Sequence, residues 1–94
     1  MKVWKYELSI TDDQTVVMPR GAKILSAQNQ YEKVTIWALV NEYESITEKV
    51  HFHIAGTAHP LPKNPMEFID TIQLSEGKLV LHVFKVLTDA EIDK

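Results

Sequence analysis

The stretch Lys33-Val-Thr-Ile-Trp-Ala-Leu-Val40 is almost continuously apolar or β-branched. Such a run is typical of a central β-strand that is covered on both faces. Outward from it, residues 3–10 and residues 46–54 alternate polar with apolar side chains, and Val50, Phe52 and Ile54 share one face of the second stretch. Alternation with a period of two predicts half-buried strands, so the chain is predicted to be all-β.

Four further strands are predicted by similar patterns, at residues 15–18, 22–28, 68–74 and 78–86. Gly77 supplies the corner of the last hairpin, residues 55–65 form the longest irregular connection, and Thr88 with Glu91 predicts a short C-terminal helical turn. About seven strands without a long helix predict a small antiparallel β-sandwich or barrel, with residues 1–94 as a single domain. The large aromatic residues of the strands are expected to build the core; these are Trp4, Trp37, Phe52, Phe68 and Phe84.

Composition excludes several classes of function. Ten lysines and arginines stand against thirteen aspartates and glutamates, and a net charge of −3 disfavours binding to duplex nucleic acid. The chain has no cysteine, which excludes disulfides, thiolate metal sites and thiol catalysis. No apolar run approaches the roughly 18 residues of a membrane-spanning helix, so a soluble protein that does not bind membranes is expected.

Two strands carry more apolar surface than one small sandwich can cover. Both faces of residues 34–40 and of residues 79–86 are apolar. Each sheet of a sandwich buries one face, so the excess predicts self-association, most simply as a dimer.

Histidine is the one enriched residue type whose side chain could bind a metal or take part in catalysis. His51 and His53 lie two apart on one strand face, and His59 follows in the next loop, so the three could form a metal site of a small metal-dependent hydrolase. The pattern is more often a pair of ordinary surface histidines, so we predict no metal, no cofactor and no enzyme. The carboxylates Asp12, Asp13, Glu42, Glu44 and Glu48 lie in turns or on polar faces, where nothing predicts a catalytic pair.

The loop Gly56-Thr-Ala-His-Pro-Leu-Pro62 is the better candidate for a binding site. Its glycine permits close approach of the backbone, its prolines stiffen the chain, and Thr57 and His59 offer a hydroxyl and an imidazole. The alternative is that these two side chains satisfy backbone groups of an irregular loop. Arg20, the one arginine, is the only fork-shaped donor for a phosphate, although it could equally be a solvated turn residue.

Several segments are similar to a family of small, mostly uncharacterised proteins encoded by phages and prophages. The similar stretches are residues 4–8, 14–16, 18–25, 37–40, 56–62, 69–73 and 81–84. The Gly-Thr-x-His-Pro loop and the strand Leu81-His-Val-Phe84 carry the resemblance most clearly, and they add His82 to the ligand-binding candidates Arg20, Thr57 and His59.

The resemblance implies a non-enzymatic phage accessory protein in the cytoplasm of the bacterial host. Such a protein could evade host defence by sequestering a small nucleotide-like signal or by blocking a host protein. A structural component of the virion is the alternative that the same resemblance leaves open.

Overall fold

The computed structural model describes residues 1–93, and Lys94, the last residue of the predicted domain, lies outside the described residues. Seven strands follow one another along the described chain, and only short helical segments accompany them. The strands are β1 (Lys2–Leu8), β2 (Asp13–Pro19), β3 (Lys23–Gln30), β4 (Lys33–Val40), β5 (Thr47–Gly56), β6 (Met66–Leu74) and β7 (Leu79–Val86). The 3₁₀ turn η1 (Ser75–Gly77) joins β6 to β7, and the helix α1 (Asp89–Ile92) ends the described chain. The predicted all-β class is confirmed.

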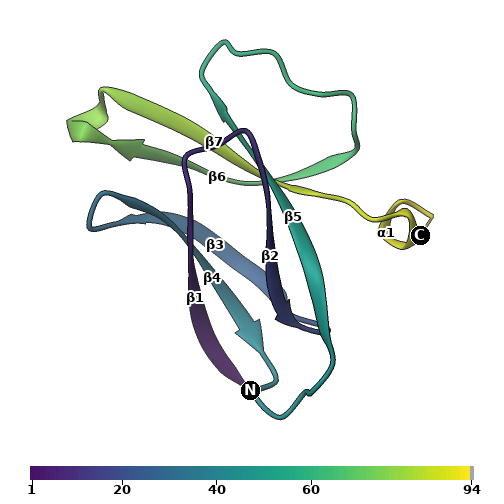
Figure 1. Cartoon of the computed structure of the whole chain (residues 1–94). Helices are drawn as coiled ribbons and strands as arrows, with labels where there is room; N and C mark the ends of the chain where they lie inside the picture. Colours follow the sequence, from purple (N-terminus) through teal and green to yellow (C-terminus); the bar gives the residue numbers. More distant parts are fainter. Residues whose placement is uncertain (94) are drawn as a thin grey trace.

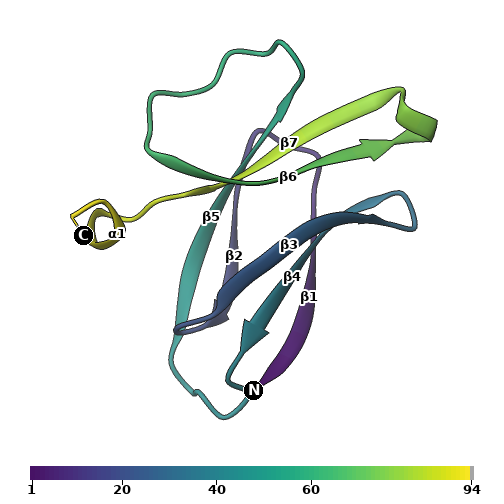
Figure 2. The same cartoon turned by 180° about the vertical axis from the view of Figure 1, so that it is seen from behind.

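The strands form two antiparallel sheets in a sandwich-like arrangement (Figures 1 and 2). One sheet has the order β1-β4-β3, and the other has the order β2-β5-β7-β6. The central position predicted for residues 33–40 is confirmed, because β4 pairs along its length with β1 on one side and β3 on the other. Alternate residues of β4, from Val34 to Val40, have no solvent exposure and face the second sheet.

The core is aliphatic, with one central aromatic ring. Phe52 on β5 is fully buried, whereas Trp37 and Phe84 are half-buried. The expectation that Trp4 and Phe68 belong to the core is wrong, since they are 39% and 55% exposed. Both lie on strands at the edge of a sheet, where no further strand covers the side chain.

Several boundaries differ from the predicted ones. Strand β3 continues past its predicted end at residue 28 to Gln30, and the β3–β4 hairpin turns at Tyr31 and Glu32, which adopt φ of 54° and 63°. Asn29 makes this turn possible, because its Oδ1 accepts the Glu32 N–H at 2.9 Å and its Nδ2 donates to the Glu32 carboxylate. Strand β1 ends at Leu8, and β5 continues through Gly56, which shortens the predicted loop.

Side chains join the two sheets where β3 lies beside β6. The Ala27 N–H donates to Asp70 Oδ2 at 2.9 Å, and Asn29 Nδ2 donates to the Gln73 carbonyl at 2.9 Å. A bulge in β6 between Phe68 and Asp70 shifts the register at this point. The β3 edge therefore finds its partners in polar side chains and carbonyls of β6 instead of in a regular ladder.

The short C-terminal helical turn begins with the predicted capping residues. Thr88 and Glu91 form a reciprocal capping box, in which each side chain accepts a hydrogen bond from the backbone of the other residue. Just before it, the Leu87 N–H donates to the Pro65 carbonyl at 3.0 Å. No helix within residues 1–93 has the length and apolar character needed to cross a bilayer.

Candidate functional site

The outer face of the four-stranded sheet collects three of the four histidines. Val50, Phe52 and Ile54 of β5 point into the core, so His51 and His53 between them point outward. His82 on β7 lies on the same face, because it pairs with Ala55 two positions beyond His53. The fold thus brings together histidines that lie about 30 residues apart in the chain.

His53 is held by a carboxylate. Its Nδ1 lies 3.0 Å from Asp13 Oδ1, and His51 Nε2 lies 3.3 Å from the same oxygen. The His53 side chain is only 9% exposed, so its interpretation as an ordinary surface histidine is wrong. Burial follows from its central strand, on which Asp13 of β2 pairs on one side and Phe84 of β7 on the other.

This contact fixes the chemistry of the His53 ring. An ionised carboxylate only accepts hydrogen bonds, so Nδ1 carries the proton and, in the neutral ring, Nε2 presents a lone pair. The hydrogen bond from His53 is the main cause that lowers the pKa of Asp13 below its ordinary value, and the charge of His53 and the contacts of His51 act in the same direction. Asp13 therefore stays ionised at neutral pH and keeps the ring in this orientation.

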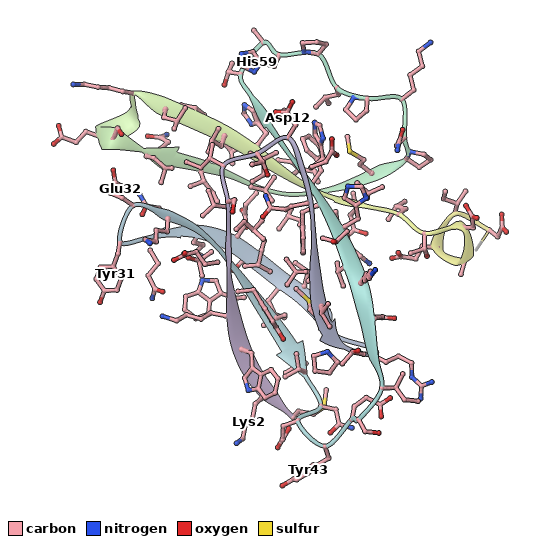
Figure 3. All side chains as sticks on the ribbon, viewed as in Figure 1. Lys2, Asp12, Tyr31, Glu32, Tyr43 and His59 are labelled. Carbon is pink, nitrogen blue, oxygen red and sulfur yellow. The ribbon has the colours of Figure 1, made fainter. Side chains whose placement is uncertain are left out.

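His53 lines a small surface hollow of about 190 Å³, which we call the His53 hollow. The hollow is lined by Asp12, His53, Ile54, Ala55, His59 and Pro60. Within the described chain, His53 Nε2 has no hydrogen-bond partner, yet it is not among the unpaired polar atoms closed off from solvent. Asp12 and His59 line the same hollow, and Figure 3 places their side chains at one end of the molecule.

His59 closes over the backbone of β5. Its N–H donates to the Gly56 carbonyl at 3.1 Å, in a turn that places Ala58 at a φ of 69°. A Cβ built on Gly56 would lie 3.0 Å from the His59 ring, tighter than most real contacts. A side chain at position 56 would therefore push the His59 ring outward by a few tenths of an ångström.

His82 is fully engaged by two threonines. Thr57 Oγ1 lies 2.8 Å from Nε2 of His82, and Thr71 Oγ1 lies 2.9 Å from Nδ1. A neutral imidazole donates from one nitrogen and accepts at the other, and both hydroxyls can rotate to match it. His82 thus ties the first residue of the loop to β6 and β7 and positions the loop.

Arg20 lies at the opposite end of the sheet. It follows the last residue of β2, whereas Asp12 precedes the first, so seven residues separate the two, a span of about 26 Å along the strand. Its Nε donates to Glu44 Oε1 at 3.0 Å, and the Arg20 side chain is 59% exposed. The structure brings Thr57, His59 and His82 to one end of the sheet but does not bring Arg20 to them.

The three histidines considered for a metal do not converge. His51 and His53 both turn toward Asp13, while His59 lies above Gly56. Among residues 1–93, no three histidine, aspartate or glutamate side chains are arranged to hold a metal ion.

A protein-family model described as Domain of unknown function (DUF7352) matches residues 1–93. The chain belongs to this family. The family match therefore extends over both sheets, the His53 hollow and the loop beside it. Neither the comparison with curated proteins nor the comparison with solved structures found a match. Membership of this family assigns no activity, so the function has to be argued from the site.

The sequence does not predict the place of two residues in this site. Asp12 lies in a polar turn, and the strand pattern puts His53 with His51 on the solvent face. The signal that would have found them is the pairing of β2 with β5, which sets Asp13 opposite His53. Strand pairing between residues 40 positions apart cannot be read from local periodicity.

Proposed function

We propose that this protein is a non-enzymatic binding protein that holds a small ligand in the His53 hollow. The observation that carries the proposal is the His53 ring, whose Nδ1 is held by Asp13 and which lines the hollow together with Asp12 and His59. The lone pair of Nε2 and the carboxylate of Asp12 both accept hydrogen bonds. They favour a ligand that donates, such as the amino edge of a nucleobase or a sugar hydroxyl.

The acidic side chains beside the hollow favour the nucleoside part of a nucleotide-like ligand over its phosphate. Asp12 and Asp13 place negative charge beside the hollow and oppose a phosphate, and Arg20 is too distant to offset them. The hollow is also smaller than the roughly 300–1,000 Å³ of pockets that enclose a whole drug-sized ligand. A phosphate on the ligand would therefore extend away from the hollow into solvent.

His82 lies between two threonine hydroxyls, and this arrangement favours ligand binding over catalysis. Thr57 Oγ1 contacts His82 Nε2 as a nucleophile would contact its base, but the third group is Thr71. A general base becomes an imidazolium during the reaction, and a neutral hydroxyl stabilises that charge far less than a buried carboxylate does. The histidine that has a carboxylate, His53, is not the one that contacts Thr57.

The biological setting that we propose is the one implied by the resemblance to phage and prophage proteins. The protein would act in the host cytoplasm as an accessory factor that evades defence, either by sequestering a nucleotide-like signal or by blocking a host protein. A virion component is the rival role, and it requires assembly with virions without affinity for a small molecule.

A panel of nucleosides and of linear and cyclic nucleotides tests the ligand site through the shift in melting temperature of the protein. We expect at least one nucleoside-containing compound to raise it and to be recovered intact, by mass, after heat denaturation. Asp12→Ala and His59→Ala should each weaken binding about tenfold, the value of one lost hydrogen bond to a charged or polar partner. Arg20→Ala, at the far end of the sheet, is the matched control and should bind normally.

Three results would overturn the proposal. No shift with any compound would remove the small-ligand function and leave the blocking of a host protein or the virion role. Recovery of a cleaved compound would make the protein an enzyme. A shift that both Asp12→Ala and His59→Ala retain in full would place the site elsewhere.

We also propose that the protein self-associates. The support is the apolar side chains that the edge strand β1 leaves exposed, one on each of its faces: Val3 is 55% and Trp4 is 39% exposed. Sedimentation at about 100 μM should give a species larger than the monomer, because dimers with a dissociation constant near 10 μM are mostly associated at that concentration. A strict monomer at this concentration would contradict it.

A further inference from the structure

Strand β5 is paired on only one side over half of its length. It pairs with β2 from Thr47 to His53 and with β7 only from Phe52 to Gly56. Strand β7 itself continues to pair with β6 as far as Val86, so it departs from β5 while remaining in the sheet. The residues of β5 before Phe52 therefore have a free edge on the side away from β2.

The hydrogen bonds around β5 show which backbone groups face this edge. The Arg20 N–H donates to the Ile46 carbonyl, and the Ile54 N–H donates to the Asp12 carbonyl, so even-numbered residues of β5 face β2. Successive residues of a strand direct their N–H and C=O groups to opposite sides. The backbone groups of Lys49 and the N–H of His51 therefore face away from β2, toward the free edge, while the His51 carbonyl lies beside Val86 where the β7 ladder ends.

A hollow of the described surface borders this edge. It has a volume of about 530 Å³, and we call it the β5 hollow. Residues 48–51 form one wall, residues 85–88 and Glu91 form another, and Gly21 and Ala22 close one end. Figure 1 shows the arrangement of the chain here, with β2 on one side of the lower half of β5 and only the segment leading to α1 on the other.

We propose that an extended segment of a partner protein adds to β5 as a further strand at Lys49–His51 and carries an acidic side chain opposite Lys49. Unpaired N–H and C=O groups of an exposed edge are a template for such strand addition. Three added residues span about 10 Å before the ladder with β7 begins at Phe52. The His53 hollow plays no part in this proposal, which stands whether or not a ligand binds there.

The charged side chains around the β5 hollow indicate the charge that a partner segment should carry. Lys85 is paired with Glu91, and Glu48 accepts the Gly21 N–H at 3.2 Å. Lys49 has no ion pair within residues 1–93, so it is the charge that remains for a partner, and an acidic side chain complements it. Symmetric pairing of two copies along this edge would set Lys49 near Lys49 or His51 of the other copy, which disfavours a second copy as the occupant.

Lys49→Pro removes the N–H that faces the β5 hollow without removing a bond of the β2–β5 ladder. The matched control is Val17→Pro, because Val17 pairs directly with Lys49 and its N–H faces the opposite, outer edge of β2. The probe is a displayed library of random linear peptides selected on the wild-type chain. We expect enrichment of acidic, β-branched sequences whose Kd rises at least tenfold with Lys49→Pro and stays within about twofold with Val17→Pro.

Hydrogen exchange supplies a readout that needs no variant. In the free protein, the amides of Lys49 and His51 should exchange at least tenfold faster than those of Val50 and Phe52, and an enriched peptide should slow them. Selection that enriches no peptide overturns the proposal, and so does an enriched peptide that binds Lys49→Pro as well as the wild type. Slow exchange of Lys49 and His51 in the free protein would equally overturn it, since the edge would then already be occupied.

Discussion

Phe52→Ala is expected to remove most of the stability of the fold. Phe52 is the largest fully buried side chain, and it lies on β5, the strand that contacts both β2 and β7. Truncation of a buried phenylalanine costs about 3–5 kcal/mol, because the lost transfer free energy adds to the cost of the cavity. Single domains have about 5–15 kcal/mol in total, so the melting temperature should fall by at least about 12 °C.

Phe68→Ala is the matched control for this prediction. Phe68 is 55% exposed, and its ring meets that of Phe84 edge to face at a centroid distance of 5.6 Å. Such an aromatic pair contributes about 0.5–1.5 kcal/mol, so the control should lose far less stability than Phe52→Ala. Thermal denaturation followed by circular dichroism measures both variants, and equal losses would contradict the assignment of Phe52 to the centre of the core.

Asp70→Ala is expected to weaken the connection between the two sheets by about 1–3 kcal/mol. Asp70 Oδ2 accepts the N–H of Ala27, a residue that is 2% exposed, at the junction of β6 with β3. Removal of the carboxylate leaves a buried N–H without a partner, and the cost is the desolvation of that group. Guanidinium denaturation should show a lower midpoint for this variant.

Asp70→Asn separates the hydrogen bond from the charge. The side-chain oxygen of asparagine can still accept the Ala27 N–H, so this variant should retain most of the stability that Asp70→Ala loses. If both variants lost the same amount, the charge of Asp70 would matter and its contact with Ala27 would not. If neither lost stability, the side-chain connection between β3 and β6 would contribute nothing to the fold.

The strand predictions are confirmed where the hydrophobic pattern within one segment is strong. The continuous apolar run from Val34 to Val40 predicts a central strand, and β4 does lie between β1 and β3. The predicted burial of both faces holds in full only for the face that packs on the second sheet, because Trp37 and Leu39 on the other face are half-buried. The alternation around Phe52 indicates which residues of β5 face the core. The Thr88 and Glu91 pair predicts the terminal turn, because a capping box depends only on residues three positions apart.

The candidate site was predicted only in part. The loop from Gly56 to Pro62 was singled out by its glycine and prolines, and His59 does line the His53 hollow. Arg20 was grouped with it on chemical type, but its position depends on the direction of β2, which runs away from the loop. Residue chemistry indicates what a side chain can bind, whereas its neighbours depend on how distant strands pair.

The amino-acid sequence by itself determined the strand content, the central position of β4 and the inward face of β5, since each follows from the spacing of apolar residues within one segment. Only the tertiary structure decided that Asp13 meets His53, that Asp70 meets Ala27, and that β7 leaves Lys49 and His51 with a free edge. These contacts join residues 40 to 43 positions apart or depend on where a ladder stops. Register between such segments is set by the packing of the whole core, which no local pattern contains.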